Sequence, residues 1–130
     1  MSLSEYFENS KGIGVLATAD KEGVVNVAVY ARPHMKDENT ATFLMADRLT
    51  HANLQSNPHA AYLFVESGGG YKGKRLHLTK TAEDDSPEAA EALRRRPRME
   101  VCESPEGSKT YVVTFRIDKV LPLIGSGDRS

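Results

Sequence analysis

The sequence contains one cysteine, Cys102, and no tryptophan. A single cysteine cannot form an intramolecular disulfide and has no second thiolate with which to bind a metal, so we interpret Cys102 as an ordinary thiol. No apolar run approaches the ~18 residues of a membrane-spanning helix. The first residues lack the basic start and apolar segment of a secretory signal. Together these absences predict a cytoplasmic protein that does not act at a membrane.

An excess of charge of either sign is also lacking. Lysine and arginine total 17 against 18 acidic residues, which leaves a formal net charge of −1. Such a chain has no general attraction for nucleic acid or for anionic membranes, so any anion site must be local. The four histidines lack the i, i+4 spacing of a helical zinc site, and no metal site is predicted. They are His34, His51, His59 and His77.

What is present suits one globular domain of 130 residues, of which 39% are hydrophobic. Apolar and alternating segments predict about six strands, with connections of hairpin length. The predicted strands cover residues 13–19, 24–31, 41–46, 59–66, 74–82 and 109–121. The first of these is apolar apart from Thr18, which predicts a strand covered on both faces. The fold class is therefore mainly β (α+β), a small antiparallel barrel over residues 1–124 with a flexible tail at 125–130.

Two or three short helices complete the prediction. Residues 3–10 are predicted to form the first, with Ser4 as its cap and Tyr6 and Phe7 on its buried side. The last begins with a Ser86 cap and ends at Pro97. An apolar stripe along that last helix is expected from Ala89, Ala92 and Leu93. Its arginines at 94–96 are explained by the negative C-terminal end of the helix rather than by RNA binding.

The turn between residues 46 and 50 is the most informative stretch for function. It connects an apolar strand to a short helix that ends before Pro58. The start of a helix offers unpaired N–H groups and the positive end of a dipole, which suit phosphate. Arg48 adds a cation and Thr50 a hydroxyl, and our hypothesis is that this turn holds the phosphate of FMN. The alternative is that Asp47 or Thr50 is a simple N-cap and Arg48 a solvated charge.

A glycine-rich segment at residues 67–73 precedes the fifth predicted strand. No helix follows it directly, so it lacks the setting of a P-loop or a dinucleotide-binding loop. We interpret it as a hairpin connection or a mobile flap.

The order of these motifs resembles the pyridoxamine 5′-phosphate oxidase-like family, whose fold is the FMN-binding split barrel. The order is a hairpin ending at Arg32 and Pro33, an apolar strand at 43–46, the segment 49–54, Asn57 with Pro58, and a strand beginning near 73–76. The resemblance covers nearly the whole chain. It implies a homodimer with FMN at the subunit interface.

The resemblance also assigns cofactor-binding roles by position. Tyr30, Ala31 and Arg32, which leave the second strand, are expected beside the flavin ring. The next strand and turn are expected to follow the ring, the ribityl chain and the phosphate; their residues are Leu44, Met45, Arg48, Leu49 and Thr50. Arg75 matches a position that reaches the flavin from the partner subunit. Asn53 is interpreted as a structural residue of the helix.

Two departures from the family pattern limit what the resemblance implies. Leu49 and Thr50 stand where members often carry adjacent basic residues, so Arg48 is expected to supply the charge. The substrate-phosphate residues of true pyridoxamine phosphate oxidases are not recognised, and that reaction is not predicted.

The prediction is an FMN-dependent oxidoreductase or flavin reductase. The resemblance to the family implies NADH or NADPH as the electron donor. Arg32 or Arg75 would stabilise the anionic reduced ring. The alternatives are a deazaflavin-dependent reductase, a non-catalytic flavin- or haem-binding carrier or sensor, and a barrel that contacts a protein partner and binds no cofactor.

Overall fold

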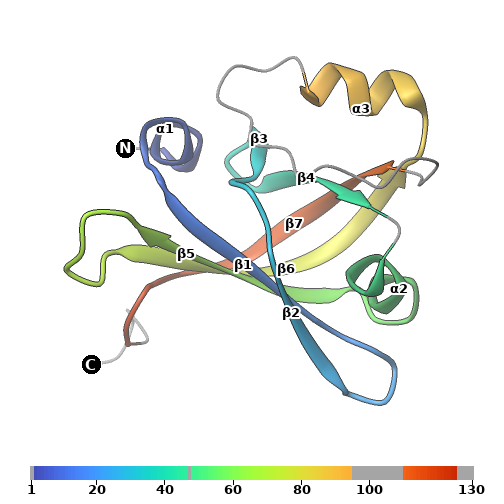
Figure 1. The fold of residues 1–130 in the computed structure, drawn as a ribbon, viewed down its shortest axis with the longest axis horizontal. Coiled ribbons are helices and arrows are strands. Elements are labelled where there is room, and N and C mark those ends of the chain that lie inside the picture. Colours follow the sequence, from blue (N-terminus) through green and yellow to red (C-terminus); the bar gives the residue numbers. More distant parts are fainter. Residues whose placement is uncertain (1, 47, 95–109, 126–130) are drawn as a thin grey trace.

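The computed structural model in Figure 1 describes residues 2–46, 48–94 and 110–125. In this part of the chain the elements are α1 (Leu3–Asn9), β1 (Gly12–Ala19), β2 (Val25–Val29), β3 (His34–Asp37), β4 (Thr40–Ala46), α2 (Leu49–Ser56), β5 (His59–Glu66), β6 (Gly73–Asp84), α3 (Pro87–Arg94) and β7 (Thr110–Pro122). Every strand pairing is antiparallel, in the order β2-β1-β5-β6-β7-β4-β3. The mainly β class is confirmed, with seven strands described rather than about six.

The sheet bends around one hydrophobic core, as the crossing strands in Figure 1 show. Alternate residues of each strand point inward. The core comprises Phe7, Leu16, Ala41, Phe43, Met45, Leu54, Tyr62, Phe64, Leu76, Leu78, Val113 and Phe115. Helix α1 contributes Phe7 and α2 contributes Leu54, so both helices are anchored on the barrel by apolar side chains.

Both predicted hairpins are confirmed. The turn between β1 and β2 has Gly23 at a φ of 86°, the left-handed region that glycine adopts without a steric penalty. The glycine-rich segment joins β5 to β6, with Glu66 N donating to Lys72 O at 2.8 Å. Strand β5 has the predicted bounds.

Strand β3 was not expected, because no strand was predicted between residues 31 and 41. The strand is short, lies at the sheet edge and pairs with β4 through an irregularity between Met35 and Asp37. An edge strand with charged, exposed side chains carries little hydrophobic alternation, so the sequence pattern does not reveal it.

The structure corrects two helix caps. Ser2, not Ser4, caps α1: its hydroxyl accepts from Glu5 N, and the Glu5 carboxylate accepts from Ser2 N, both at 3.1 Å. Helix α2 has Arg48 as its N-cap, so Thr50 lies inside the helix and is not the cap. The other cap candidate, Asp47, lies outside the described residues.

Helix α3 confirms the predicted Ser86 cap, whose hydroxyl accepts from Ala89 N at 3.2 Å. Its buried alanine is Ala90, at 3% exposure, whereas Ala92 of the predicted stripe is exposed. The predictions for the Arg94 side chain, residues 95–97, Cys102 and the tail beyond 125 fall outside what the structure describes. No helix among the described residues has the length and hydropathy needed to cross a bilayer.

The expectation that residues 13–19 are covered on both faces is wrong for the single chain. The inner face of β1 is buried, but Ile13 on the outer face is 63% exposed. Side chains paired across β2, β1 and β5 continue this outer face. We use the name apolar outer face for the following residues: Val15, Ala17, Ala19, Val25, Val27, Val29, Ala61 and Leu63.

Candidate functional site

The N-terminus of α2 has the local geometry of an anion site. Strand β4 leads into Arg48, whose backbone is extended and whose side chain makes no capping hydrogen bond. Arg48 and Leu49 are exposed, while Thr50 is only 4% exposed. The first-turn N–H groups therefore donate no hydrogen bond to the N-cap side chain, and that exposed side chain carries a positive charge.

Helix α2 is held firmly against the barrel. It packs on β1, β2 and β4. The buried Asn53 amide donates to Thr18 Oγ1 at 3.0 Å, which confirms the structural role predicted for this residue. The first turn of α2 thus has a fixed position relative to the end of β4.

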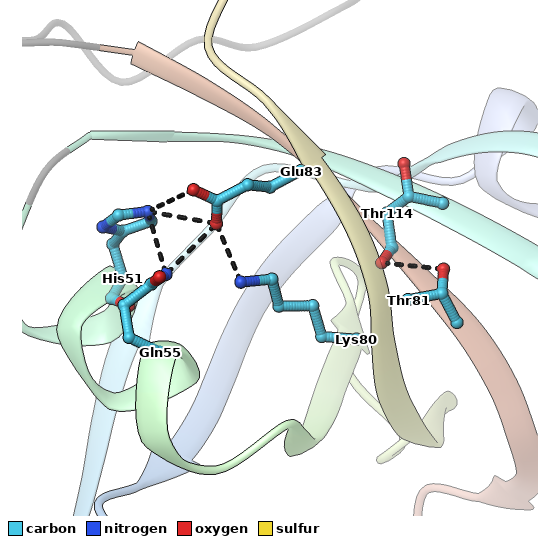
Figure 2. A network of polar contacts seen from close by, with 6 residues as sticks. All are labelled: His51, Gln55, Lys80, Thr81, Glu83 and Thr114. Atoms are coloured by element: carbon cyan, nitrogen blue, oxygen red, sulfur yellow. Dashed lines mark hydrogen bonds and ion pairs between the residues drawn. The ribbon is translucent and has the colours of Figure 1, made fainter.

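His51, in the same turn, joins α2 to the far end of β6 (Figure 2). Its Nε2 lies 3.2 and 3.1 Å from the two carboxylate oxygens of Glu83. The Gln55 amide donates to Glu83 at 3.1 Å, and Lys80 Nζ lies 2.8 Å from the same carboxylate. The His51 ring stacks on Tyr111 of β7, with centroids 3.7 Å apart. We call these five residues the His51 network.

Ionisation of Glu83 is strongly favoured within this network. Burial by itself would raise the pKa of the carboxyl group. The hydrogen bonds from Lys80, His51 and Gln55 outweigh that effect and lower the pKa from 4.5 to about 2. Glu83 is therefore a carboxylate at any physiological pH.

The two β4 candidates point in opposite directions. Met45 is 1% exposed and packs in the core, so only its backbone is available to a bound molecule. Leu44 faces outward, is half-buried and pairs with Val112 of β7. Leu44 therefore offers its side chain to the outer surface next to the α2 turn.

The segment after β2 is held by Tyr62 rather than left open. The Tyr62 hydroxyl lies 3.3 Å from Tyr30 O and 3.1 Å from Ala31 O. The Tyr30 ring packs edge-on against Phe43. This geometry fixes the backbone of Tyr30 and Ala31 at the barrel rim.

Arg32 is engaged with α1. Its Nη1 donates to Phe7 O at 3.0 Å and to Ser10 O, the carbonyls at the C-terminal end of that helix. A guanidinium in this place complements the negative end of the helix dipole. In this conformation the Arg32 side chain has a structural partner, and its predicted contact with the flavin stays a prediction.

Arg75 lies far from the α2 turn within one chain. It donates to Pro122 O at 2.9 Å and to Gly125 O, at the start of β6. Glu83, which bonds to His51, is near the other end of the same strand. At ~3.3 Å per residue the two positions are roughly 25 Å apart. The chain brings Leu44, Arg48, Leu49 and Thr50 together at the junction of β4 and α2, but not Arg75.

Sequence analysis did not identify the partners of His51. Glu83 stands in an acidic, turn-like stretch, and Tyr62 stands in an apolar run. Neither pattern carries a signal for a contact with a residue about 30 positions away. No group of three or more histidine, cysteine, aspartate or glutamate side chains among the described residues could hold a metal ion.

Comparison with known proteins identifies the relatives of this fold. The family model described as pyridoxamine 5′-phosphate oxidase matches residues 4–122. A search of curated protein sequences finds no match. An FMN-binding protein from Syntrophomonas wolfei is similar in structure, with a TM-score of 0.74 and 19% identity over 94% of this chain and 84% of that one.

Two further solved structures are also similar. HupZ from Group A Streptococcus has a TM-score of 0.72 and 20% identity over 98% of this chain and 96% of its own. A protein described as F420 reductase has a TM-score of 0.68 and 18% identity over 92% and 97%. At these identities the likeness shows a shared fold.

Proposed function

The chain belongs to the pyridoxamine 5′-phosphate oxidase family, and we propose that it binds FMN in a homodimer and acts as an FMN-dependent oxidoreductase or flavin reductase. FMN, when bound, accepts and returns a hydride; the protein supplies binding, orientation and electrostatics. The cytoplasmic location expected from the sequence stays a prediction.

The observation that supports FMN most directly is the first turn of α2, whose N-cap side chain makes no capping hydrogen bond. The first-turn N–H groups donate no hydrogen bond to that side chain, and Arg48, the N-cap residue, is exposed. A phosphate dianion would accept from these donors and gain from both charges. The outward face of Leu44 offers apolar surface for the body of the cofactor.

The apolar outer face supports a homodimer. On β2 it exposes Val25, Val27 and Val29 at 74%, 64% and 65%. These side chains continue across β1 onto β5, so the apolar surface is contiguous rather than scattered. Such a surface is typical of a protein–protein interface. A second copy of the chain is the proposed partner, because the resemblance to the family implies a homodimer.

Arg75 fits the same arrangement. Its register partner is Leu63, at the edge of the apolar outer face on β5. In a dimer formed through that face, Arg75 would lie at the interface and could reach the cofactor held by the α2 turn of the other copy. The distance between Arg75 and α2 within one chain is then no obstacle to its predicted role.

The electron donor in this proposal is NADH or NADPH. The likeness to a protein described as F420 reductase keeps a deazaflavin as the second candidate cofactor. The two differ in what they predict for the purified protein: tight binding of added FMN with bleaching by NADH or NADPH under anaerobic conditions, or preference for F420. A protein that binds FMN but is not bleached would be a carrier.

Replacing the anion-binding side chains tests the proposal. Arg48→Ala and Thr50→Val together should weaken FMN binding by about 10- to 100-fold, since charge-assisted hydrogen bonds contribute about 1.5–3 kcal/mol. Valine is chosen at position 50 because Thr50 is buried and valine keeps its shape. The measurement is a fluorescence titration of FMN with the flavin-free protein.

Arg116→Ala is the matched control, because Arg116 is an exposed cation on β7 that pairs with Asp118. It should bind FMN like the parent protein. If the double variant also binds FMN with unchanged affinity, the phosphate is not held by the α2 turn.

A further inference from the structure

The first turn of α2 is not stabilised by the side chain of its N-cap residue. In many helices a serine, threonine, aspartate or asparagine at the N-cap accepts a hydrogen bond from this turn and stabilises it. Arg48 occupies the N-cap of α2 and makes no such bond. The turn closes with a hydrogen bond from Ala52 N to Arg48 O at 3.0 Å. Because helix ends fray easily, a start of this kind depends on other contacts to stay ordered.

His51 supplies such contacts from within the turn (Figure 2). It is the third residue of α2 and is only 6% exposed. Its ring lies nearly parallel to that of Tyr111, with 15° between the planes and 3.7 Å between the centroids. Its Nε2 lies within 3.2 Å of both carboxylate oxygens of Glu83. The side chain of His51 therefore attaches the start of α2 to β6 and β7.

These contacts lie on a different side of α2 from those of Asn53. Two residues correspond to about 200° around a helix with 3.6 residues per turn, so His51 and Asn53 project from nearly opposite sides. The Asn53 amide bonds to Thr18 Oγ1 of β1 at 3.0 Å, whereas His51 contacts β6 and β7. The beginning of α2 is thus attached to the sheet in two directions, which restricts its rotation as well as its displacement.

The charges of the His51 network suit a neighbouring anion site. The Glu83 carboxylate pairs with Lys80 Nζ at 2.8 Å, so the network carries no excess of negative charge from this pair. An ionised carboxylate only accepts hydrogen bonds, so His51 Nε2 carries a hydrogen and donates to it. The Gln55 amide donates to the same carboxylate at 3.1 Å. Glu83 is therefore engaged within the network and does not compete with an anion for the N–H groups of the first turn.

We propose that His51 is a positioning residue for the phosphate of the cofactor. Its ring takes the place of a side-chain cap: it orders the first turn of α2 without occupying the N–H groups of Leu49 and Thr50. An ordinary capping side chain would accept from the same turn and compete with phosphate. Only molecules with an ordered turn bind the anion, so loosening the turn lowers the affinity in proportion. This role rests on the proposed function, which places the phosphate at the start of α2.

The first test uses inorganic phosphate, which does not require the flavin. Phosphate is titrated into the ¹⁵N-labelled protein at pH 7 and constant ionic strength, and the amide chemical shifts of residues 48–50 are followed. His51→Leu removes both the ring and the donor, and we expect it to weaken phosphate binding by roughly three- to tenfold. His51→Gln retains an N–H donor that can reach Glu83, so its affinity should lie between those of the leucine variant and the parent protein.

Thr79→Val is the matched control. The Thr79 hydroxyl donates to Asp118, so the substitution breaks a polar contact between β6 and β7 that does not involve α2. Valine keeps the shape of the side chain. This variant should bind phosphate like the parent protein.

Amide hydrogen exchange separates a positioning role from a general loss of stability. At the start of α2, Ala52 N donates to Arg48 O at 3.0 Å, and at its end Asn57 N donates to Asn53 O at 2.9 Å. Both amides should be protected in the parent protein. In His51→Leu the exchange of Ala52 should accelerate at least about tenfold more than that of Asn57, because only the first turn is released.

The second binding test compares FMN with riboflavin, which has the same ring and ribityl chain but no phosphate. His51→Leu should weaken FMN binding by roughly three- to tenfold and change riboflavin binding by less than about twofold. Fluorescence titrations of the flavin-free protein measure both affinities. A variant that only damages the barrel would weaken the binding of both flavins.

The proposal is overturned if phosphate does not bind at the turn of the parent protein, or if His51→Leu binds it equally well. It is also overturned if Ala52 is unprotected in the parent protein, or if Ala52 and Asn57 accelerate equally in the variant. Failure of the proposed function is a different result. Phosphate binding that depends on His51, without any FMN binding, would retain the positioning role and remove the flavin. FMN binding that depends on Arg48 but not on His51 would do the reverse.

Discussion

Gly14 shows how one residue determines the backbone that leaves β2. A Cβ atom at this position would lie 1.9 Å from Tyr62 Oη and 2.6 Å from Tyr30 O. Gly14→Ala should therefore displace the tyrosine that holds the carbonyls of Tyr30 and Ala31. We expect a loss of about 1–3 kcal/mol in the free energy of unfolding, the usual cost of overpacking. Urea denaturation followed by circular dichroism measures it.

Tyr62→Phe is the matched comparison for Gly14→Ala. It removes the hydrogen bonds of the hydroxyl without a clash, at a cost of about 1 kcal/mol. In the Tyr62→Phe background the cost of Gly14→Ala should fall, because the closest atom to the new Cβ is absent. If Gly14→Ala lowers the free energy of unfolding equally in both backgrounds, the absence of a side chain at Gly14 does not serve to make room for the Tyr62 hydroxyl.

Single residues were predictable where a local rule determines them. The left-handed Gly23 and the Ser86 cap follow from turn and helix-end chemistry. Arg32 is different, because the local sequence does not predict which carbonyl oxygen accepts a hydrogen bond from its guanidinium. Its bond to Phe7 O joins positions 25 residues apart. The resemblance to a family assigned Arg32 to a cofactor, and only the folded chain reveals its engagement with α1.

At the scale of elements, the His51 network joins α2 to β6 and should make stability depend on pH. The folded-state pKa of Glu83 is about 2, below its ordinary value of 4.5. The stabilisation from its ionised form is therefore fully present above pH ~4.5 and is lost as the pH falls toward about 2. After allowance for solvent screening we expect about 1–2 kcal/mol.

Glu83→Gln tests this dependence. The free-energy difference between the parent protein and the variant should be largest near pH 7 and should narrow below pH ~4.5, because the parent carboxylate is then progressively protonated. Urea titrations at a series of pH values measure it. Glu22→Gln, in the exposed turn after β1, is the control and should follow the parent curve. A difference that stays constant with pH would mean that the charge of Glu83 does not stabilise the fold.

Elements were predicted best where the apolar pattern is long. Strand β5 has the predicted bounds, because its apolar run is delimited by Pro58 and by the glycine-rich turn. Strand β3 was missed because it is short and its last two residues, Lys36 and Asp37, are exposed. Its existence depends on pairing with β4, which local sequence does not encode.

For the whole molecule, the failed expectation about β1 is informative. Its residues are apolar on both faces, yet one chain covers the inner face and only partly covers the outer one. The same discrepancy recurs on β2, whose outward residues are three exposed valines. An apolar face that the single chain leaves exposed fits the homodimer proposed above, in which a second copy would cover it. The sequence therefore contained a signal for an interface, although not the identity of the partner.

Val27→Lys tests the homodimer at the centre of this face. Val27 is 64% exposed and pairs with Ala17, so the single chain should tolerate lysine at this position while the interface should not. Light scattering after size-exclusion chromatography should give twice 14.3 kDa for the parent protein and 14.3 kDa for the variant. Lys21→Glu, in the exposed turn between β1 and β2, is the control and should remain dimeric.

Because the proposed cofactor site needs Arg75 from the partner, the monomeric variant should also bind FMN more weakly. A monomeric parent protein would exclude the interface, and a folded monomeric variant with full FMN affinity would place the cofactor within one chain.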